Sequence, residues 1–449
     1  MGSELWDGDG RVWPGSLKDA VFGFSEEKFE RLLKENLFAK NIMRSAVGFV
    51  DVYGSWISAF ESLKSRDTGL PMFELNSSHA TLILAPYDWR KSIVHGAQAV
   101  ASAIKRAIAL HGDDVRIHIA AHSMGGLVAR YFLDSGAYGV SDGVENVETF
   151  LTFGSPHRGA PVALAGAIGL ETAKFLNSEQ SSRLANDPAL RGLYDLFPQP
   201  GSSPFWESGA QDTRLNPREL WDPTIAALLG LNEQTLAASR QTLREIAAPR
   251  PGPRRFLFVG NRLKTVTHFL LQGRRVFPVA TKDGGDGTVN LQGSILENHQ
   301  IRFVDKNHMS LIDSRDTRSA LQDIFNADGI LPMDPETRVV MTVSDLILAS
   351  KAPFEIALTL EGPSNELDGS LFFQRAVAGR DAVEISESDF STDQRIMEQT
   401  VRYSGPDLLA LHVNIESLGG PGVYRPVFMT NDDKPREFVG PAFLVTLDS

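Results

Sequence analysis

Ile117-His118-Ile119-Ala120-Ala121-His122-Ser123-Met124-Gly125-Gly126 joins a segment of strand type to a segment of helical type. Residues 115–120 form a short apolar run that follows the turn residues Gly112-Asp113-Asp114, which is typical of a buried strand. After Ser123 the apolar residues recur every three or four positions, as on one face of a helix: Leu127, Val128, Tyr131 and Phe132. The serine therefore lies at a strand-to-helix switch.

Such a serine, between small residues, is typical of the nucleophile elbow of α/β-hydrolases. The turn must be tight and strained, and it raises the hydroxyl clear of the sheet. The N–H of Met124, near the start of the following helix, can help to hold an oxyanion. Ala121 stands where many elbows have glycine, a modest steric change that we expect the turn to tolerate. The alternative is a buried turn without chemistry.

Composition excludes several classes of protein. The chain has 449 residues, which favours two domains, and a net charge of −12, which argues against a nucleic-acid partner. It has no cysteine, so disulfides, thiolate metal sites and cysteine nucleophiles are excluded. The sequence shows neither a run of membrane-spanning length nor a secretory signal, and it predicts a cytoplasmic protein.

Strand and helix patterns alternate through the first part of the chain. Strands are predicted at residues 47–53, 80–85, 115–120, 149–153, 255–260, 275–280 and 301–304. Helices are predicted at residues 26–37, from Trp56, after Arg90, after Ser123 and at 317–325. Near-continuous apolar strands that alternate with helices indicate a parallel sheet covered on both faces.

The alternation stops between about residues 162 and 253. Helical fragments with Pro and Gly breaks predict a cap or lid inserted over the active site. Its aromatic residues make Phe205, Trp206 and Trp221 candidates for substrate binding. The alternative is a helical excursion that only packs.

The character of the sequence changes again after a linker at residues 329–335. Short strand patterns follow without helices, at residues 339–348, 354–360, 371–377, 397–403, 408–415 and 442–447. These indicate a small antiparallel sandwich or barrel. We therefore predict a catalytic domain at residues 1–332 and a β-sandwich-like accessory domain at residues 333–449, in which no catalytic constellation is visible.

A serine nucleophile needs a base, and the base needs an acid that orients it. In α/β-hydrolases they follow in the order serine, acid, histidine. Asp286 lies after the strand at 275–280 and His308 after the strand at 301–304, and we prefer them to the alternatives Asp283 and His299. His299 precedes its strand and should point away from the elbow.

The remaining polar residues carry weaker signals. His122 adjoins the nucleophile and is expected to pack and hydrogen-bond rather than act as the base. A metal site built from His157 or the Asp283/Asp286 pair is a weak hypothesis, because no histidine pair at helical spacing accompanies them. No cofactor is required.

Five strings, taken together and in this order, resemble the lecithin–cholesterol acyltransferase family of lipase-like α/β-hydrolases. The strings are Pro86-Tyr87-Asp88-Trp89-Arg90, Ala121-His122-Ser123-Met124-Gly125, Gly154-Ser155-Pro156-His157-Arg158-Gly159-Ala160, Gly285-Asp286-Gly287-Thr288-Val289 and Asn307-His308-Met309-Ser310-Leu311. The resemblance covers roughly residues 1–325. It implies Ser123, Asp286 and His308 as the triad and an ester-bearing lipid as substrate. Asp88 and Arg90 would form either a buried ion pair or a simple strand-end turn.

The resemblance also raises a question at the N-terminus. Family members begin with an apolar strand that leads into a loop supplying the second oxyanion donor. Here Met1-Gly2-Ser3 resembles the end of that loop, and the strand is expected to be missing or to lie upstream. Met1 and Gly2 are accordingly the candidates for the second oxyanion donor.

The sequence thus predicts an α/β-hydrolase with a helical cap, a missing first strand and a C-terminal β domain. The expected activity is that of a serine esterase, lipase or lipid O-acyltransferase working through an acyl-enzyme. The hypothesis leaves open whether water or an alcohol accepts the acyl group, and whether a small ester is the substrate. The cap would give transient contact with a membrane surface. The alternative function is that of a catalytically impaired hydrolase scaffold whose β domain binds a protein, sugar or membrane.

Overall fold

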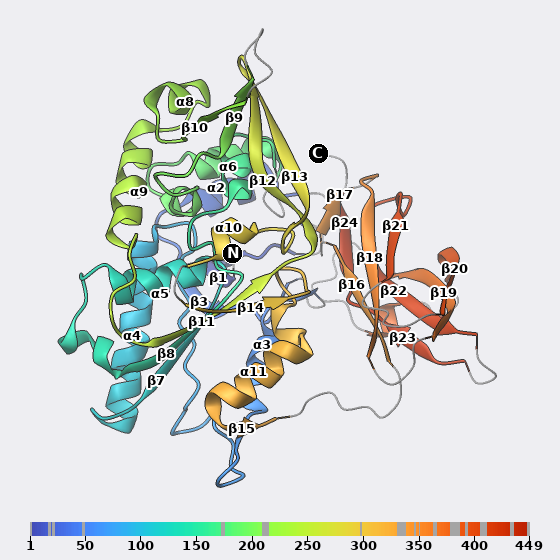
Figure 1. Cartoon of the computed structure of the whole chain (residues 1–449), viewed down its shortest axis with the longest axis horizontal. Helices are drawn as coiled ribbons and strands as arrows, with labels where there is room; N and C mark the ends of the chain where they lie inside the picture. The colour runs from blue at the N-terminus through green and yellow to red at the C-terminus, as the bar shows by residue number, and fades with distance from the viewer. Residues whose placement is uncertain are drawn as a thin grey trace. The chain divides into compact units, whose positions relative to one another are not determined.

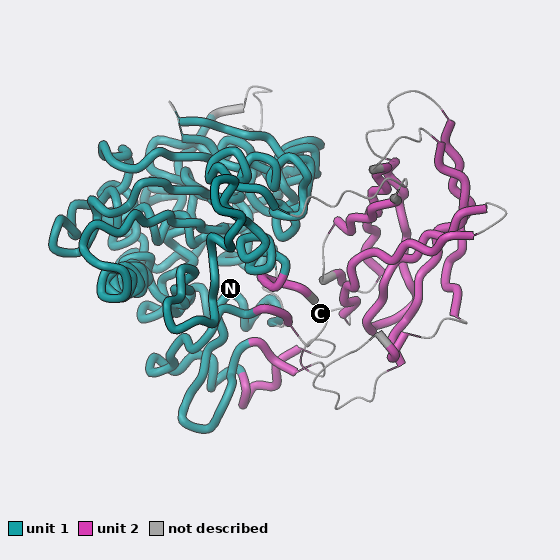
Figure 2. The backbone as a smooth tube through the Cα atoms, turned by 90° about the horizontal axis from the view of Figure 1, so that it is seen from below, with its two compact units in different colours: residues 1–13, 29–43, 55–329 teal, residues 14–28, 44–54, 330–449 magenta. Residues whose placement is uncertain are grey.

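The structure is a computed structural model. It describes residues 2–16, 19, 23–46, 50–171, 176–208, 215–296, 299–329, 338–344, 347–349, 351–361, 366–377, 387–390, 394–404, 411–431 and 435–446. The chain divides into two compact units, coloured separately in Figure 2. Unit 1 comprises Met1–Trp13, Phe29–Met43 and Ser55–Gly329, and unit 2 comprises Pro14–Lys28, Arg44–Gly54 and Ile330–Ser449.

The centre of unit 1 is a parallel sheet with the strand order β14-β11-β8-β7. Its strands are β7 (Ile117–His122), β8 (Val147–Phe153), β11 (Arg254–Gly260) and β14 (Gln300–Val304). All three neighbouring pairs are parallel, as the alternating sequence pattern predicted. Since the carboxyl ends of parallel strands share one edge, the segments after β7, β8, β11 and β14 meet there.

Helices connect and cover these strands (Figure 1). They are α3 (Gly54–Glu61), α4 (Ile93–His111), α5 (Met124–Asp134), α6 (Pro161–Ala167), α7 (Ser178–Ala185), α8 (Pro223–Leu228), α9 (Glu233–Glu245), α10 (Leu291–Ser294) and α11 (Arg315–Phe325). Helix α2 (Glu26–Leu33) is four residues shorter than the predicted 26–37. Glycine lets α4 approach α5 closely, because a Cβ at Gly96 would lie 2.8 Å from Val128 Cγ2.

Three further sheets complete unit 1. One has the order β2-β1-β3, with β1 (Ser3–Asp7), β2 (Gly10–Trp13) and β3 (Phe38–Ile42). A second has the order β10-β9-β12-β13, with β9 (Phe205–Ser208), β10 (Leu215–Arg218), β12 (Leu263–Gln272) and β13 (Arg275–Gly285). The third pairs β6 (Lys64–Ser65) with β15 (Ala327–Asp328).

Three strand predictions differ from this structure. The structure assigns no strand at residues 80–85, and the N–H groups of Thr81 and Leu82 both donate to Glu74 O, so the start of this segment forms a local turn. The strand predicted at 275–280 exists as β13, but it pairs antiparallel with β12 and lies outside the parallel sheet. The predicted strand at 47–53 is present only as β5 (Val50–Asp51), and residues 47–49 lie outside the described residues.

The segment between β8 and β11 contains α6 to α9, the 3₁₀ helix η3 (Arg191–Leu196) and the strands β9 and β10. It is mostly helical, as the sequence predicted. It also supplies half of the sheet that contains β12 and β13. The remaining 3₁₀ helices of unit 1 are η1 (Val140–Asp142), η2 (Val144–Asn146) and η4 (Leu311–Asp313).

Unit 2 is rich in strands. One sheet has the order β16-β18-β21 and another β17-β24-β22-β19-β20, with β23 paired to β22. Their bounds are β16 (Arg338–Val343), β17 (Ile347–Ala349), β18 (Phe354–Glu361), β19 (Glu366–Arg375), β20 (Ile396–Ser404), β21 (Leu411–Ile415), β22 (Gly422–Thr430), β23 (Glu437–Val439) and β24 (Phe443–Thr446). Unit 2 also contains the 3₁₀ helix η5 (Glu387–Asp389) and the pair of β4 (Ser45–Ala46) with β5. The central strand β22 was not predicted.

Among the residues that the structure describes, no helix has the length and apolar character that crossing a membrane requires.

Candidate active site

Ser123 occupies the strained turn that the sequence predicted between β7 and α5. Its backbone has φ 54° and ψ −129°, a conformation that costs a non-glycine residue about 1–3 kcal/mol. Two hydrogen bonds hold the turn: Ser123 N donates to Phe153 O at 2.9 Å, and Gly126 N donates to Ser123 O at 2.9 Å. Strain retained in this way is common where a side chain must be presented for chemistry.

The two glycines after the serine have different steric roles. A Cβ on Gly126 would lie 2.1 Å from Ser155 Oγ, so only glycine lets the loop after β8 lie this close to α5. A Cβ on Gly125 would lie 3.8 Å from Ala121 Cβ, which is ordinary contact. The structure therefore accommodates alanine at position 121, as expected.

Asp286, His308 and Ser123 form one continuous hydrogen-bonded chain. His308 Nε2 lies 2.9 Å from Ser123 Oγ, and His308 Nδ1 lies 2.7 Å from Asp286 Oδ2. The other carboxylate oxygen, Oδ1, accepts the N–H groups of Thr288 at 2.9 Å and Val289 at 2.7 Å. Asp286 is 1% exposed and His308 is 8% exposed. The arrangement can pass a proton from the hydroxyl to the imidazole and stabilise the resulting cation.

Space for the Asp286–His308 pair comes from glycines at two strand ends. Gly154 follows β8 with φ 55°, and a Cβ there would lie 2.8 Å from Asp286 Oδ2 and 3.0 Å from His308 Nδ1. Gly260 ends β11, and a Cβ there would lie 2.3 Å from Asp286 Cβ. Gly154 belongs to one of the five strings that carry the family resemblance, but its steric role was not predicted.

His122 braces the backbone of His308. Its Nε2 donates to His308 O at 2.8 Å, and its ring packs against the rings of His308 and Trp56, with centroids 4.6 and 4.9 Å apart. Trp56 Nε1 in turn donates to Met309 O at 3.2 Å. Burial, and then the charge of His308, hold the pKa of His122 well below its ordinary value, so this histidine is neutral.

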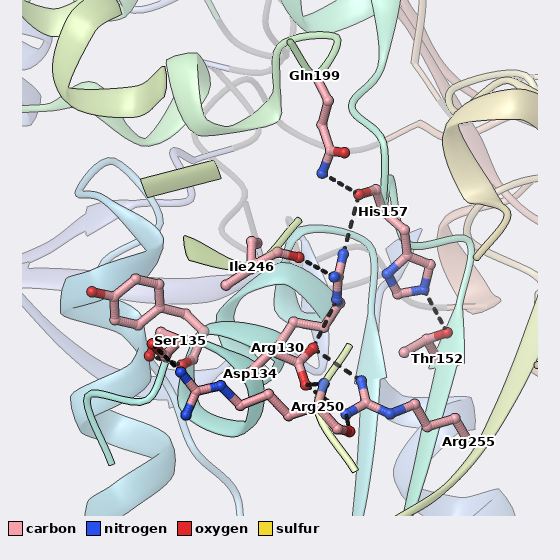
Figure 3. Close-up of polar contacts among 10 residues, drawn as sticks. Arg130, Asp134, Ser135, Thr152, His157, Gln199, Ile246, Arg250 and Arg255 are labelled. Carbon is pink, nitrogen blue, oxygen red and sulfur yellow. Dashed lines mark hydrogen bonds and ion pairs between the residues drawn. The ribbon is translucent and has the colours of Figure 1, made fainter. Parts of the chain in front are cut away.

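The helix that begins at the nucleophile is anchored further along by buried charges. Arg130 Nη1 donates to His157 O at 3.2 Å, and Arg130 Nε donates to Asp134 Oδ2 at 3.1 Å. Arg255, at the start of β11, donates to both oxygens of Asp134 at 3.0 and 2.6 Å (Figure 3). These contacts tie α5, the loop after β8 and β11 together. An Arg and an Asp four residues apart on an otherwise apolar helix are the signal that could have predicted the ion pair.

The candidate oxyanion donors are described in part. Met124 is the first residue of α5 and directly follows Ser123. Met1 lies outside the described residues. The carbonyl of Gly2 accepts Met43 N at 2.9 Å, while the hydroxyl of the following Ser3 accepts Tyr87 N at 3.1 Å. The role of the Gly2 N–H stays a prediction.

The three candidate substrate-binding aromatics occupy different environments. Phe205 is fully buried and its ring stacks on Phe269 with centroids 5.3 Å apart. Trp221 is 6% exposed, and its indole N–H donates to Pro198 O at 2.9 Å. Trp206, on the other face of its strand, is half-buried.

The other sequence alternatives lie elsewhere. Asp283 is exposed, whereas Asp286 contacts His308. Within the part of the chain that the structure describes, no group of three or more His, Asp or Glu residues could hold a metal. Asp88 and Arg90 do form a buried ion pair, with Arg90 Nη2 2.6 Å from Asp88 Oδ2. The same guanidinium also donates to Leu32 O and Lys34 O.

Comparison with known proteins gives one result that bears on this site. A search of curated proteins found no match to the chain. Residues 76–214 match the family model described as lecithin:cholesterol acyltransferase. The match includes the elbow, α5 and the loop after β8, and it confirms the resemblance inferred from the sequence motifs. The matched family suggests acyltransferase- or lipase-type activity on lipids. On this match, residues 76–214 of the chain are similar to the lecithin:cholesterol acyltransferase family of lipase-like proteins.

Proposed function

We propose that this protein is a serine ester hydrolase or O-acyltransferase that acts on ester lipids, either phospholipids or acylglycerols. Ser123 attacks the acyl carbonyl, His308 accepts its proton, and Asp286 orients and stabilises the imidazolium. The Met124 N–H, with the backbone near Gly2 as the second donor, holds the oxyanion of the tetrahedral intermediate.

The observation that carries this proposal is the hydrogen-bonded chain from Ser123 Oγ through His308 to Asp286, at 2.9 and 2.7 Å. Both distances lie within the range that nucleophile activation requires. The strained backbone of Ser123 is a second, independent support.

The first half-reaction forms the ester bond between the acyl carbon and Ser123 Oγ and breaks the bond to the leaving alcohol, which takes its proton from His308. In the second half-reaction, water or another alcohol attacks the acyl carbon and gives its proton to the same imidazole. The bond between the acyl carbon and Ser123 Oγ then breaks, and the imidazole returns the proton to Ser123. Both acceptors use the same three residues, so the contents of the acceptor pocket decide between hydrolysis and transfer.

The lipid assignment rests on the similarity of residues 76–214 to the family model, and the segment between β8 and β11 is proposed as the cap over the acyl chain. The alternative of a catalytically impaired binding protein is not favoured, because the nucleophile, base and acid are present and in hydrogen-bonding contact.

A panel of phospholipids and acylglycerols tests the function. The wild-type protein is incubated with each lipid, with and without an added acceptor alcohol, and released fatty acid is separated from transferred ester. We expect product from at least one lipid, and none above background with Ser123→Ala. If only small soluble esters give product, the lipid assignment is wrong, but the assignment as a serine esterase stands. Equal product from Ser123→Ala would remove the proposed chemistry.

A further inference from the structure

The sheet β10-β9-β12-β13 of unit 1 has two unlike faces. On one face Phe205 and Phe269 are fully buried and Leu271 is 1% exposed. Directly opposed residues of neighbouring strands share a face, and successive residues alternate between faces. The pairing of Leu270 with both Trp206 and Phe277 therefore puts these three side chains in one row on the opposite face.

This row is partly exposed to solvent in the described part of unit 1. Phe277 is 42% exposed, and Trp206 and Leu270 are half-buried. Strand β13 forms an edge of the sheet, so the row ends at a free strand edge. A contiguous aromatic and aliphatic row on an exposed face is typical of a surface that contacts something apolar.

The charge around the row is opposite to that of the whole chain. Residues 263–285 form a hairpin, drawn as the two long strands β12 and β13 in Figure 1. They contain four basic residues and one acidic residue (Lys264, Arg274, Arg275, Lys282 and Asp283), whereas the chain has a net charge of −12. Arg275 pairs with Gln272 on the same face as Phe277, and Arg274 lies in the adjoining turn.

We propose that this face, which we name the hairpin face (Trp206, Leu270, Arg275 and Phe277), docks on the surface of a lipid aggregate that carries anionic headgroups. A tryptophan and a phenylalanine beside arginines match an interface in which rings enter the acyl boundary and cations remain among phosphates. The inference rests on the proposed function and adds the surface by which the enzyme would reach its substrate.

The chain connects the hairpin face to the catalytic acid. Strand β13 ends at Gly285, and Asp286 follows it directly. The Asp286 carbonyl accepts a hydrogen bond from His308 N at 2.9 Å. The base of the hairpin is therefore linked to Asp286 through the chain and to His308 through this hydrogen bond. Docking through the hairpin would therefore bring lipid to β13, the strand that ends beside Asp286.

The test measures binding without turnover, on vesicles of ether-linked lipids that lack the ester. One set contains phosphatidylcholine alone, and the other contains phosphatidylcholine and phosphatidylglycerol in equal parts. We expect the wild-type chain to float with the mixed vesicles and more weakly with phosphatidylcholine. Arg274→Gln/Arg275→Gln should lower binding to mixed vesicles about thirtyfold, since each basic residue near an anionic surface contributes about 1 kcal/mol. Phe277→Ala should lower binding to both sets by about tenfold.

Matched controls replace an exposed phenylalanine and two arginines elsewhere in unit 1. Phe38→Ala removes a ring that is 52% exposed on β3. Arg116→Gln/Arg254→Gln changes side chains that are 80% and 59% exposed, near the amino ends of β7 and β11. If these control variants bind vesicles as the wild type does, the result supports the hairpin face as the lipid-binding surface.

The inference is overturned if wild-type protein floats with neither vesicle set, if the hairpin variants bind as wild type, or if the controls lose as much binding. Hydrolysis of a monomeric p-nitrophenyl ester separates the two proposals, because the hairpin variants should retain it fully. An inactive wild-type protein that still floats would refute the proposed function and leave the docking surface standing.

Discussion

Gly154→Ala tests the steric basis of the site. Alanine at φ 55° costs about 1–2 kcal/mol in backbone strain. Its Cβ would also lie 2.8 Å from Asp286 Oδ2 and 3.0 Å from His308 Nδ1. Asp286 cannot turn aside freely, because its other oxygen accepts two backbone N–H groups. To restore ordinary contact the pair must shift by roughly half an ångström.

A shift of that size should lower kcat by about 10- to 100-fold, because misplacing catalytic groups by about 1 Å can cost a factor of 10². The matched control is Gly230→Ala, since Gly230 has φ 68° and a Cβ added there would meet nothing within 4 Å. Both variants should lose the thermal stability that the backbone strain costs, Gly154→Ala more because of its crowding, but only Gly154→Ala should lose kcat with a p-nitrophenyl ester. If Gly154→Ala retains wild-type kcat, or if Gly230→Ala loses as much, the crowding argument is wrong.

Three further predictions follow from other contacts. Asp286→Asn should lower kcat by about 10⁴ with little change in thermal unfolding, since the amide oxygen can still accept Thr288 and Val289; a loss under tenfold would count against its role. Asp134→Asn should cost about 3–5 kcal/mol in urea unfolding, because Arg130 and Arg255 lose their buried carboxylate; a cost below 1 kcal/mol, roughly that of a surface pair, would contradict this. Burial, followed by neighbouring positive charges, holds the pKa of both His122 and His157 well below 6.5. The stability that the two neutral imidazoles contribute is therefore complete above pH 6.5, and it is lost as the pH falls toward the folded-state pKa. The free energy of unfolding should therefore fall below pH 6.5 by up to about 1.4 kcal/mol per pH unit for each histidine, and His157→Gln should reduce that slope.

The elbow and its flanking elements could be predicted because local signals agree there. Apolar periodicity changes at Ser123. Strand β7 begins and ends within two residues of the predicted strand, and helix α5 begins near the expected helix start. The triad partners could be chosen because each follows a strand pattern, which places it at a strand's carboxyl end. Asp286 follows β13 rather than a strand of the parallel sheet, so its expected sheet position was wrong, and its catalytic role stays a prediction.

Two of the strands that were not predicted, β12 and β22, have identifiable causes. Strands β12 and β13 are joined by Gly273-Arg274 with Gly273 at φ 60°, a two-residue hairpin turn whose sequence signal was overlooked. Strand β22 contains Pro426, which argues against a central strand. On one side of β22, residues 422–424 pair with β24 and residues 427–429 pair with β23. Pro426 lies between these two stretches, so its missing N–H interrupts no hydrogen-bond ladder on that side.

The contacts that brace the site were beyond local patterns. Trp56, His122 and Met309 meet only because three distant segments converge, and the clearance at Gly154 and Gly260 depends on where Asp286 is placed. Nothing in the periodicity of these segments indicates which glycine is sterically required.

The central claim is that Ser123 is a nucleophile activated by His308. The most direct measurement is labelling with a fluorophosphonate probe, followed by mass spectrometry of the intact protein and of its peptides. We predict a single adduct on the peptide that contains Ser123, no adduct in folded Ser123→Ala, and strongly slowed labelling in His308→Ala. A folded wild-type protein that takes up no label, or that carries it on another residue, would contradict the account.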